Sequence, residues 1–403
     1  MRFNGFTKVW ESTKIGEIAE VVGGGTPKTE VEEYWNGEIK WFTPSEIGKT
    51  KYIFDSERHI TNEGLKNSSA KLLPKNTILL SSRATVGEIS IASTECSTNQ
   101  GFQSLITKNN VDNEFIYYLI TTIKNEFLRR SSGSTFLEIS KNEIKRIPIN
   151  IPELSEQNKI SNLFSAIDNK IEILEKKHQY YQDFKKYLMQ RIFSSQEDKL
   201  RFKNDKQWNV YLLRNFINEY NERMGNKSNL PILSSTLNGI FLQNEYFNKS
   251  VSSKDVKNYK IVPNGYFTYR SMSDTGKFRF NIQSIVEVGI ISPAYPVFST
   301  QNIDDYFLYY YLNNSNFIKK QILSLKEGGT RYALSFSKFK KLKISLPSLE
   351  EQEKIANFLS AVDKKIDLIQ TQIQKMEEFK KGLLQQMFVV QLILSLLQNK
   401  KHI

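Results

Sequence analysis

The residues of this sequence that could carry out catalysis are few and widely separated. The three histidines, His59, His178 and His402, have no partner at the spacing that a metal site requires. The single cysteine, Cys96, excludes a disulfide framework and a cysteine-based zinc site, and we expect its side chain to be buried. The sequence contains neither a Gly-x-Ser-x-Gly nucleophile motif nor the (Asn/Asp)-Pro-Pro-Tyr motif of an amino-methyltransferase. We therefore expect no catalytic residue, no metal site and no cofactor on this chain.

Two short motifs suggest other chemistry, but neither is specific. The segment Gly23–Lys28 does not have the spacing of a phosphate-binding P-loop, and a tight turn is the better interpretation. The tripeptides Glu38–Lys40 and Glu143–Lys145 have a Glu-x-Lys pattern that a nuclease site can use, but such tripeptides are common. The chemistry that remains is binding.

Basic residues alternate with aromatic and small polar residues in segments expected to be loops. Arg can bind guanine through two hydrogen bonds, Asn or Gln can bind adenine, and Ser, Thr and Lys can bind phosphates. A single such residue more often has only a solvated surface role, but the net charge of +13 favours nucleic acid for the set as a whole. The candidate DNA-binding residues are Thr43, Ser45, Arg83, Thr85, Asn99, Gln100, Ser134, Thr135, Arg270, Ser271, Lys277, Arg279, Thr330, Arg331 and Tyr332.

The elements that must position these residues are organised by an internal duplication. Residues 151–193 align without a gap to residues 346–388, at an offset of 195, with 19 of 43 positions identical. Each copy predicts one long helix, because apolar residues recur every three or four positions and no proline interrupts the pattern. Ser155 and Ser348 are the expected N-cap residues. The residues expected to pair the helices are Ile160, Phe164, Ile167, Ile171, Phe184, Leu188, Ile355, Leu359, Val362, Ile366, Phe379 and Leu383.

A segment of about 150 residues precedes each predicted helix, so the expected order is globule, helix, globule, helix. The predicted domains are 1–152, 153–200 (helix and linker), 201–347, and 348–403 (helix and tail). In the first globule the pattern predicts strands at 39–43, 77–80, 88–92 and 144–151, and a helix at 115–128. The second globule repeats these signals faintly at its ends, with a divergent middle. The predicted fold class is therefore α+β, with two mixed domains and an internal pseudo-two-fold duplication.

The pattern resembles the specificity subunits of type I restriction–modification systems. The resemblance covers the chain to Phe388, and Val389–Ile403 continues beyond the usual end of the family's second helix. The residues that carry it are the helix openings Pro152–Ile160 and Pro347–Ile355, the closings Phe184–Gln190 and Phe379–Gln385, and the short motifs Gly23–Pro27, Trp41–Thr43, Asn99–Gly101 and Gly289–Pro293.

The resemblance implies two target-recognition domains that each read one half of a bipartite, asymmetric site in double-stranded DNA. It implies that two long antiparallel helices separate these domains and set the spacing of the half-sites. It also implies that two methyltransferase subunits, which carry S-adenosylmethionine and methylate adenine, dock on the chain through the same apolar residues that are expected to pair the helices. One or two restriction–translocase subunits, using ATP and Mg²⁺, join where the system includes them. The chain itself would be a non-catalytic recognition subunit.

Two other interpretations stay open at this stage. One is a self-contained DNA methyltransferase or nuclease whose motifs differ from the known ones. The other is a non-enzymatic coiled-coil scaffold that binds nucleic acid. The N-terminus has no apolar signal-peptide core, and no apolar run is long enough to span a bilayer, so we expect no membrane association and a cytoplasmic location. The bases recognised, the length of the spacer and the role of the tail are not predicted.

Overall fold

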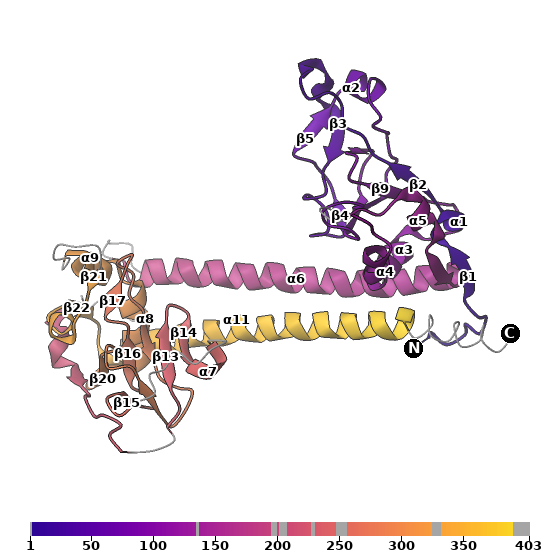
Figure 1. The fold of residues 1–403 in the computed structure, drawn as a ribbon. Helices are drawn as coiled ribbons and strands as arrows, with labels where there is room; N and C mark the ends of the chain where they lie inside the picture. The colour runs from indigo at the N-terminus through magenta and orange to yellow at the C-terminus, as the bar shows by residue number, and fades with distance from the viewer. Residues whose placement is uncertain are drawn as a thin grey trace. The chain divides into compact units, whose positions relative to one another are not determined.

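The chain divides into two compact units in the computed structural model, which describes residues 2–133, 137–194, 200, 208–226, 230–246, 256–324 and 332–389 (Figure 1). Unit 1 comprises Met1–Leu174 and Gln372–Ile403, and unit 2 comprises Glu175–Thr371. Two long helices, α6 (Leu154–Ile192) and α11 (Leu349–Leu384), each continue from one unit into the other. The predicted boundaries at 152 and 347 follow changes of secondary structure, whereas each compact unit takes in a part of both helices.

The long helices form where the duplication predicts them. Helix α6 has 39 residues, and a single π-helical turn, η3 (Gln385–Val389), follows α11. Ser348 caps α11, because its Oγ accepts a hydrogen bond from the N–H of Glu351 at 3.4 Å. The prediction for Ser155 is wrong, because α6 begins one residue earlier. Glu153 already accepts the N–H of Gln157, and Ser155 Oγ donates to the Glu153 carboxylate at 2.8 Å.

Unit 1 contains a five-stranded sheet in the order β2-β9-β6-β7-β4 and a three-stranded sheet in the order β5-β3-β8. Both sheets lie in the part of unit 1 that precedes α6. The strands are β1 (Glu11–Lys14), β2 (Ala19–Gly23), β3 (Trp35–Phe42), β4 (Tyr52–Ile53), β5 (Arg58–Ile60), β6 (Ile78–Leu80), β7 (Ile89–Ala92), β8 (Ser97–Thr98), β9 (Gln103–Thr107) and β10 (Pro148–Ile151). The shorter helices are α1 (Ile15–Ile18), η1 (Glu32–Tyr34), α2 (Asn62–Lys66), α3 (Asn113–Thr122), α4 (Lys124–Arg129) and α5 (Lys141–Arg146).

The predicted strands at 39–43, 77–80 and 88–92 correspond to β3, β6 and β7. The predicted helix at 115–128 is two helices, because the chain leaves helical geometry at Ile123 between α3 and α4. The predicted strand at 144–151 is wrong in its first half. Residues 141–146 form α5 instead, which Ser140 caps through its side chain.

Unit 2 repeats the framework of unit 1. Its four-stranded sheet has the order β12-β20-β16-β18, which corresponds to β2-β9-β6-β7 in unit 1. The strands are β11 (Asn209–Leu212), β12 (Ile217–Glu219), β13 (Leu233–Thr236), β14 (Gly239–Leu242), β15 (Lys260–Pro263), β16 (Phe267–Tyr269), β17 (Met272–Ser273), β18 (Phe280–Ile282), β19 (Val288–Ile291), β20 (Val297–Thr300), β21 (Tyr332–Ala333) and β22 (Lys343–Leu346). The shorter helices are η2 (Leu213–Asn215), α7 (Gln243–Tyr246), α8 (Asp305–Asn314), α9 (Asn316–Ser324) and α10 (Phe336–Phe339).

The first and last strands of each globule pair with each other. Strand β1 is antiparallel to β10 in unit 1, and β11 is antiparallel to β22 in unit 2. Each globule is therefore closed at its base, where the chain enters and leaves on neighbouring strands. This arrangement confirms the predicted α+β class and the duplication of the globules.

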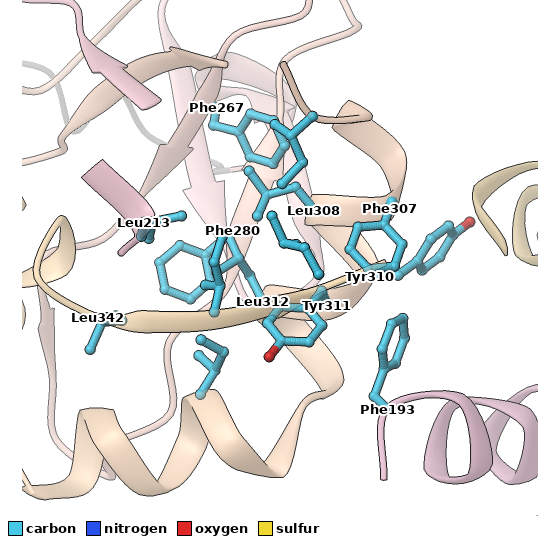
Figure 2. Close-up of a cluster of buried hydrophobic side chains, with 14 of the residues drawn as sticks. Phe193, Leu213, Phe267, Phe280, Phe307, Leu308, Tyr310, Tyr311, Leu312 and Leu342 are labelled. Carbon is cyan, nitrogen blue, oxygen red and sulfur yellow. The ribbon is translucent and has the colours of Figure 1, made fainter. Parts of the chain in front are cut away.

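An aromatic residue at the end of each helical repeat packs into a globule core. In unit 1, Phe388 lies 6.1 Å from Trp10 and 5.4 Å from Phe115, measured between ring centroids. In unit 2, its counterpart Phe193 lies 6.4 Å from Trp208 and 5.9 Å from Phe307. Figure 2 shows the ring of Phe193, the residue directly after α6, facing the rings of Phe307 and Tyr311 on α8 in the core of unit 2. The start of α6 and the end of α11 share one core in unit 1, so the two helices run antiparallel there.

A charged network in unit 1 predicts a dependence of stability on pH. Lys51 Nζ donates to Glu114 Oε2 at 2.6 Å, and the hydroxyls of Ser165 and Tyr52 donate to the same carboxylate. Burial alone would raise the pKa of Glu114, but the three hydrogen bonds outweigh burial and lower that pKa below its ordinary value. A lowered pKa in the folded state means that this stabilisation is present at neutral pH and is lost as the pH falls through the folded pKa.

We expect Glu114→Gln to lower the free energy of unfolding at pH 7 by about 1–2 kcal/mol, because one charge-assisted network is lost. The difference from the wild type should shrink as the pH falls from about 5 to about 3, where the wild-type carboxylate becomes protonated. Urea unfolding at several pH values measures both effects. Glu95→Gln, at an exposed position, is the control. A constant difference across this pH range would contradict the role of the ionised Glu114.

Candidate nucleic-acid interface

Unit 2 has two hollows that are large enough to hold part of a ligand, one of about 600 Å³ beside β13 and β14 and one of about 390 Å³ beside α6, α8 and α9. We call the larger one, of about 600 Å³, the hairpin hollow. Three of the predicted residues line it: Arg270, Lys277 and Arg279. Its other described lining residues include several hydroxyl and amide side chains and a single carboxylate, that of Asp274. Such a surface offers donors and acceptors for base edges and for phosphates.

A buried amide fixes the β13–β14 hairpin over this hollow. Asn281 of β18, which is 3% exposed, donates through Nδ2 to Ser235 Oγ and to the carbonyl of Thr236, each at 2.9 Å. A buried amide that lost these partners would be costly, so the bonds hold the hairpin on the sheet. At the hairpin turn, Gly239 has a φ of 128°, which favours glycine.

The three basic residues of the hairpin hollow differ in how exposed their side chains are. Arg270 and Lys277 are exposed. Arg279 is partly buried, because its guanidinium lies 5.0 Å from the ring centroid of Tyr309 on α8 and its Nη2 donates to the Tyr309 hydroxyl. The Nε of Arg279 is buried and has no hydrogen-bond partner among the residues that the structure describes. Arg270 and Lys277 are therefore the residues best placed to reach a ligand.

Two further predicted residues of unit 2 support the loop between β16 and β18. Ser271 Oγ donates to the carbonyl of Ala294 at 2.7 Å, and the Ser271 carbonyl accepts the N–H of Leu334 at 2.8 Å. Tyr332 lies on β21 and pairs with Ser273 on β17. Four predicted residues lie outside the described part of the chain, namely Ser134, Thr135, Thr330 and Arg331.

In unit 1, two motifs that are distant in sequence pack against each other. Gly25 N–H donates to the Thr98 carbonyl at 2.8 Å, and Thr26 Oγ1 donates to Gln100 Oε1. A Cβ at Gly24 would lie 2.0 Å from the Asn99 carbonyl oxygen, so only glycine allows this approach. Residues 24–28 form an open loop held by the segment 98–100, so the predicted tight turn is wrong. The predicted residues Asn99 and Gln100 are thereby fixed beside this loop.

The remaining predicted residues of unit 1 lie close to the same place. Thr43 Oγ1 is 3.0 Å from Ser45 Oγ, and Thr85 Oγ1 is 3.5 Å from the carbonyl of Pro44. Pro44 also approaches Gly101, where a Cβ would lie 2.8 Å from Pro44 Cγ. The structure thus brings together three segments, 43–45, 83–85 and 99–101, that the sequence indicated separately.

An ion pair holds the Arg83 side chain, which is nevertheless exposed enough to contact a ligand. Its guanidinium forms an ion pair with Glu138 at 2.6 Å, and the two side chains are 44% and 41% exposed. An exposed pair of this kind contributes at most about 1 kcal/mol, so a phosphate or base could replace the carboxylate. The next residue, Ala84, has a φ of 63°, a strained value for alanine. Strain of this kind is often found at functional sites.

Most of the apolar residues predicted on the helices are packed within their own unit. Ile160, Phe164, Ile167, Leu188, Ile355, Leu359, Val362 and Leu383 are buried, and Ile171, Phe184 and Ile366 are partly buried. Phe379 is 54% exposed. Tyr180 and Tyr187, which the sequence interpretation missed, are 63% and 55% exposed and lie seven residues apart on one face of α6. Docking of a partner on the helices stays a prediction, and these exposed rings are the part of the surface that it can use.

A three-residue cluster that the sequence interpretation missed recurs in both units. In unit 1, Asp168 of α6 accepts the Tyr118 hydroxyl at 2.6 Å and forms an ion pair with Lys380 of α11 at 2.6 Å. In unit 2, Asp363 of α11 accepts the Tyr310 hydroxyl at 2.7 Å and pairs with Lys185 of α6. The aspartates and the lysines are each 195 residues apart, so comparison of the repeats could have identified them.

These Tyr–Asp–Lys clusters tie each globule to both long helices. In each cluster the lysine Nζ also lies 5.7 Å from the centroid of the tyrosine ring. Burial, followed by the hydrogen bond to the aspartate, raises the pKa of Tyr118, so its hydroxyl remains a donor at neutral pH. The same contact made twice, with the helices exchanging roles, is the pseudo-two-fold relation that the duplication predicts.

The described residues show little that could support catalysis. Among them, no group of three or more His, Cys, Asp or Glu side chains could hold a metal ion. Burial raises the pKa of the Cys96 thiol to about 12, so it is a poor nucleophile. Of the helices in the described ranges, none is long and apolar enough to cross a membrane.

The repeated framework and its unlike loops define a duplicated recognition protein, and comparison with known proteins identifies its family. The family profile of the type I restriction modification DNA specificity domain matches twice, at residues 7–180 and 205–378. These matches cover most of the chain, which therefore belongs to this family of specificity subunits, the DNA-recognition components rather than the catalytic ones.

Individual relatives agree with the family match. The MjaIX specificity subunit of Methanocaldococcus jannaschii is 30% identical over 400 residues, covering 94% of this chain and 92% of the relative. The EcoR124I/EcoR124II specificity subunit of Escherichia coli is 29% identical over 187 residues, covering 42% of this chain and 46% of the relative. The crystal structure of a type I S subunit from M. genitalium has the same fold, with a TM-score of 0.58, 17% identity, and coverage of 96% of this chain and 98% of that one.

Proposed function

We propose that this chain reads a bipartite, asymmetric site in double-stranded DNA, with one half-site for each globule. It directs two methyltransferase subunits, which carry S-adenosylmethionine, to adenines within that site. Restriction–translocase subunits that use ATP and Mg²⁺ join the complex where the system includes them. The chain supplies sequence recognition and holds the other subunits in place.

One observation carries this proposal: the two units share a framework but not a recognition surface. Four strands of the two main sheets have the same order, and the bases of both globules are closed by equivalent strand pairs. The surface segments differ, since unit 1 has the β5-β3-β8 sheet and unit 2 has the β13–β14 hairpin with its basic hollow. Two equal frameworks with unlike surfaces favour two different half-sites.

Mapping methylated adenines in cells that carry this chain with its partner genes tests the proposal. We expect methylation at one motif made of two unequal halves separated by a spacer of fixed length. A symmetric motif, or no sequence-specific methylation, would contradict it. Transfer of methyl groups from labelled S-adenosylmethionine by the isolated chain would instead favour a self-contained methyltransferase. Binding to duplex DNA without sequence preference would favour a scaffold.

Arg270 is the residue for which we expect the clearest effect on recognition in unit 2. It is exposed, lines the hairpin hollow, and has a donor pattern suited to guanine. Arg270→Ala should weaken binding to the cognate site by about 1–3 kcal/mol and relax specificity at one base pair. Binding measurements against a panel of single-base variants of the site detect both effects. Arg214→Ala, at an exposed arginine of the same unit that does not line the hollow, is the control.

An equal loss of affinity for every DNA in the panel would assign Arg270 to a phosphate rather than to a base. Unchanged affinity for the cognate site would remove Arg270 from the interface.

A further inference from the structure

A second hollow in unit 2, of about 390 Å³, lies where α6, α8 and α9 meet. We call it the helix hollow. Four basic residues line it: Lys185 and Lys186 of α6, Arg279, and Lys319 of α9. No carboxylate occurs among its described lining residues, and amide side chains supply most of the remaining polar surface. A concave surface with this excess of positive charge suits an anion.

The positive charge of the helix hollow is only partly neutralised by its surroundings. Lys185 forms an ion pair with Asp363, as described above. Lys186 and Lys319 are exposed. The buried Nε of Arg279, for which the described part of the chain offers no hydrogen-bond partner, belongs to a side chain that lines this hollow as well as the hairpin hollow. An unpaired buried donor costs free energy unless a ligand supplies an acceptor.

The first residue of α9 adds a further attraction for an anion. Asn316, which lines the hollow, begins this nine-residue helix. The first N–H groups of a helix have no intrahelical partner, and the helix dipole makes this end positive. Helix N-termini beside basic side chains are common phosphate sites.

The duplication repeats only part of this lining, because Lys185 and Lys186 correspond to Lys380 and Lys381 in the second helical repeat. In the alignment of the two helical repeats, Gln182 corresponds to Glu377. The two lysines of α6 are therefore common to both repeats, whereas the lack of a carboxylate at position 182 distinguishes this hollow from the corresponding place in unit 1.

We propose that the helix hollow binds one phosphate group of the DNA backbone beside the half-site that unit 2 reads. This inference rests on the proposed DNA recognition and adds a contact outside the recognition loops. Arg279 lines both hollows, so a strand whose bases lie at the hairpin hollow has a basic surface leading to α6 and α9. The contact is to phosphate, so it strengthens binding without selecting a sequence.

The test compares the wild-type complex with a Lys186→Ala/Lys319→Ala variant on cognate and unrelated DNA. Both lysines are exposed, so the variant should fold normally. Losing the contact with this one phosphate should reduce the slope of log affinity against log salt by about 0.9 and weaken cognate and unrelated DNA by the same factor. A Lys340→Ala/Lys341→Ala variant, which removes equal charge from exposed positions of the same unit, is the control.

DNA with a single neutral methylphosphonate linkage identifies the phosphate. We expect the wild type to lose affinity at a linkage beside the second half-site, and the Lys186/Lys319 variant to be insensitive at that linkage while remaining sensitive elsewhere. Equal sensitivity of wild type and variant at every linkage would overturn the inference. A second outcome would also overturn it. If inorganic phosphate raised the melting temperature of the wild type but not of the variant, and the variant bound DNA as tightly as the wild type, the hollow would be a site for a free anion.

The failure of this inference is distinct from failure of the proposed function. If the variant methylates the same bipartite motif with unchanged salt dependence, the recognition role stands and the helix hollow has no part in it. If the wild type shows no sequence-specific binding or methylation, the proposed function itself is wrong.

Discussion

Replacing residues 208–346 with the corresponding segment of another family member is expected to change one half of the methylated motif and to leave the other half unchanged. Methylation at the original motif should fall to background, and a new hybrid motif should appear. The structural reason is that β11 and β22 are paired, so the exchanged segment begins and ends on neighbouring strands. The exchanged globule can therefore keep its own loops while its base remains closed.

The exchange must preserve the contacts that tie the globule to the helices. Tyr310 and Trp208 lie inside the exchanged segment, whereas Asp363, Lys185 and Phe193 lie outside it. A donor segment should therefore supply a tyrosine and a tryptophan at the equivalent positions. Exchange of residues 11–151, bounded by β1 and β10, is the matched experiment and should change only the opposite half-site. If either exchange altered both halves of the motif, independent recognition by the two globules would be refuted.

Lengthening both long helices by four residues is expected to lengthen the spacer between the half-sites while both half-sites stay the same. Four residues add about 6 Å of rise and about 40° of rotation beyond one full turn. The insertions belong after Leu174 in α6 and after Ile369 in α11, which are equivalent positions in the repeats near the boundaries between the compact units. The added length corresponds to about one or two base pairs of B-DNA. Sequencing of methylated sites reads the spacer directly.

An insertion in one helix alone is the control for the insertion in both helices. The Asp168–Lys380 and Asp363–Lys185 pairs each lie inside one unit, so the double insertion leaves both intact. An insertion in α6 alone shifts one helix against the other, so at least one of these pairs must break. We expect the single insertion to lose stability and methylation. An active double-insertion variant with an unchanged spacer would show that helix length does not set the spacing.

Periodicity and repetition were sufficient to determine the long helices and the duplicated order of the chain. A helix is a local structure, so the apolar seam and the absence of proline predict α6 from its own residues. The repeat at an offset of 195 residues implied two similar globules, and the equal strand orders of their main sheets confirm it. Net charge and the missing catalytic motifs indicated a recognition protein, which the family match supports.

Tertiary structure decided how the short motifs meet, because sheets and loops are built from contacts between distant residues. Nothing local to Gly24 shows that it must approach Asn99, since that constraint comes from the carbonyl oxygen of a segment more than seventy positions later. For the same reason, the sequence indicated Arg270 and Lys277 as basic residues but could not show that they line one hollow with a hairpin. The helix hollow lies between three helices, and the charges of any one of these helices do not indicate a binding site. Only their packing brings Lys186, Lys319 and the buried Nε of Arg279 to one place.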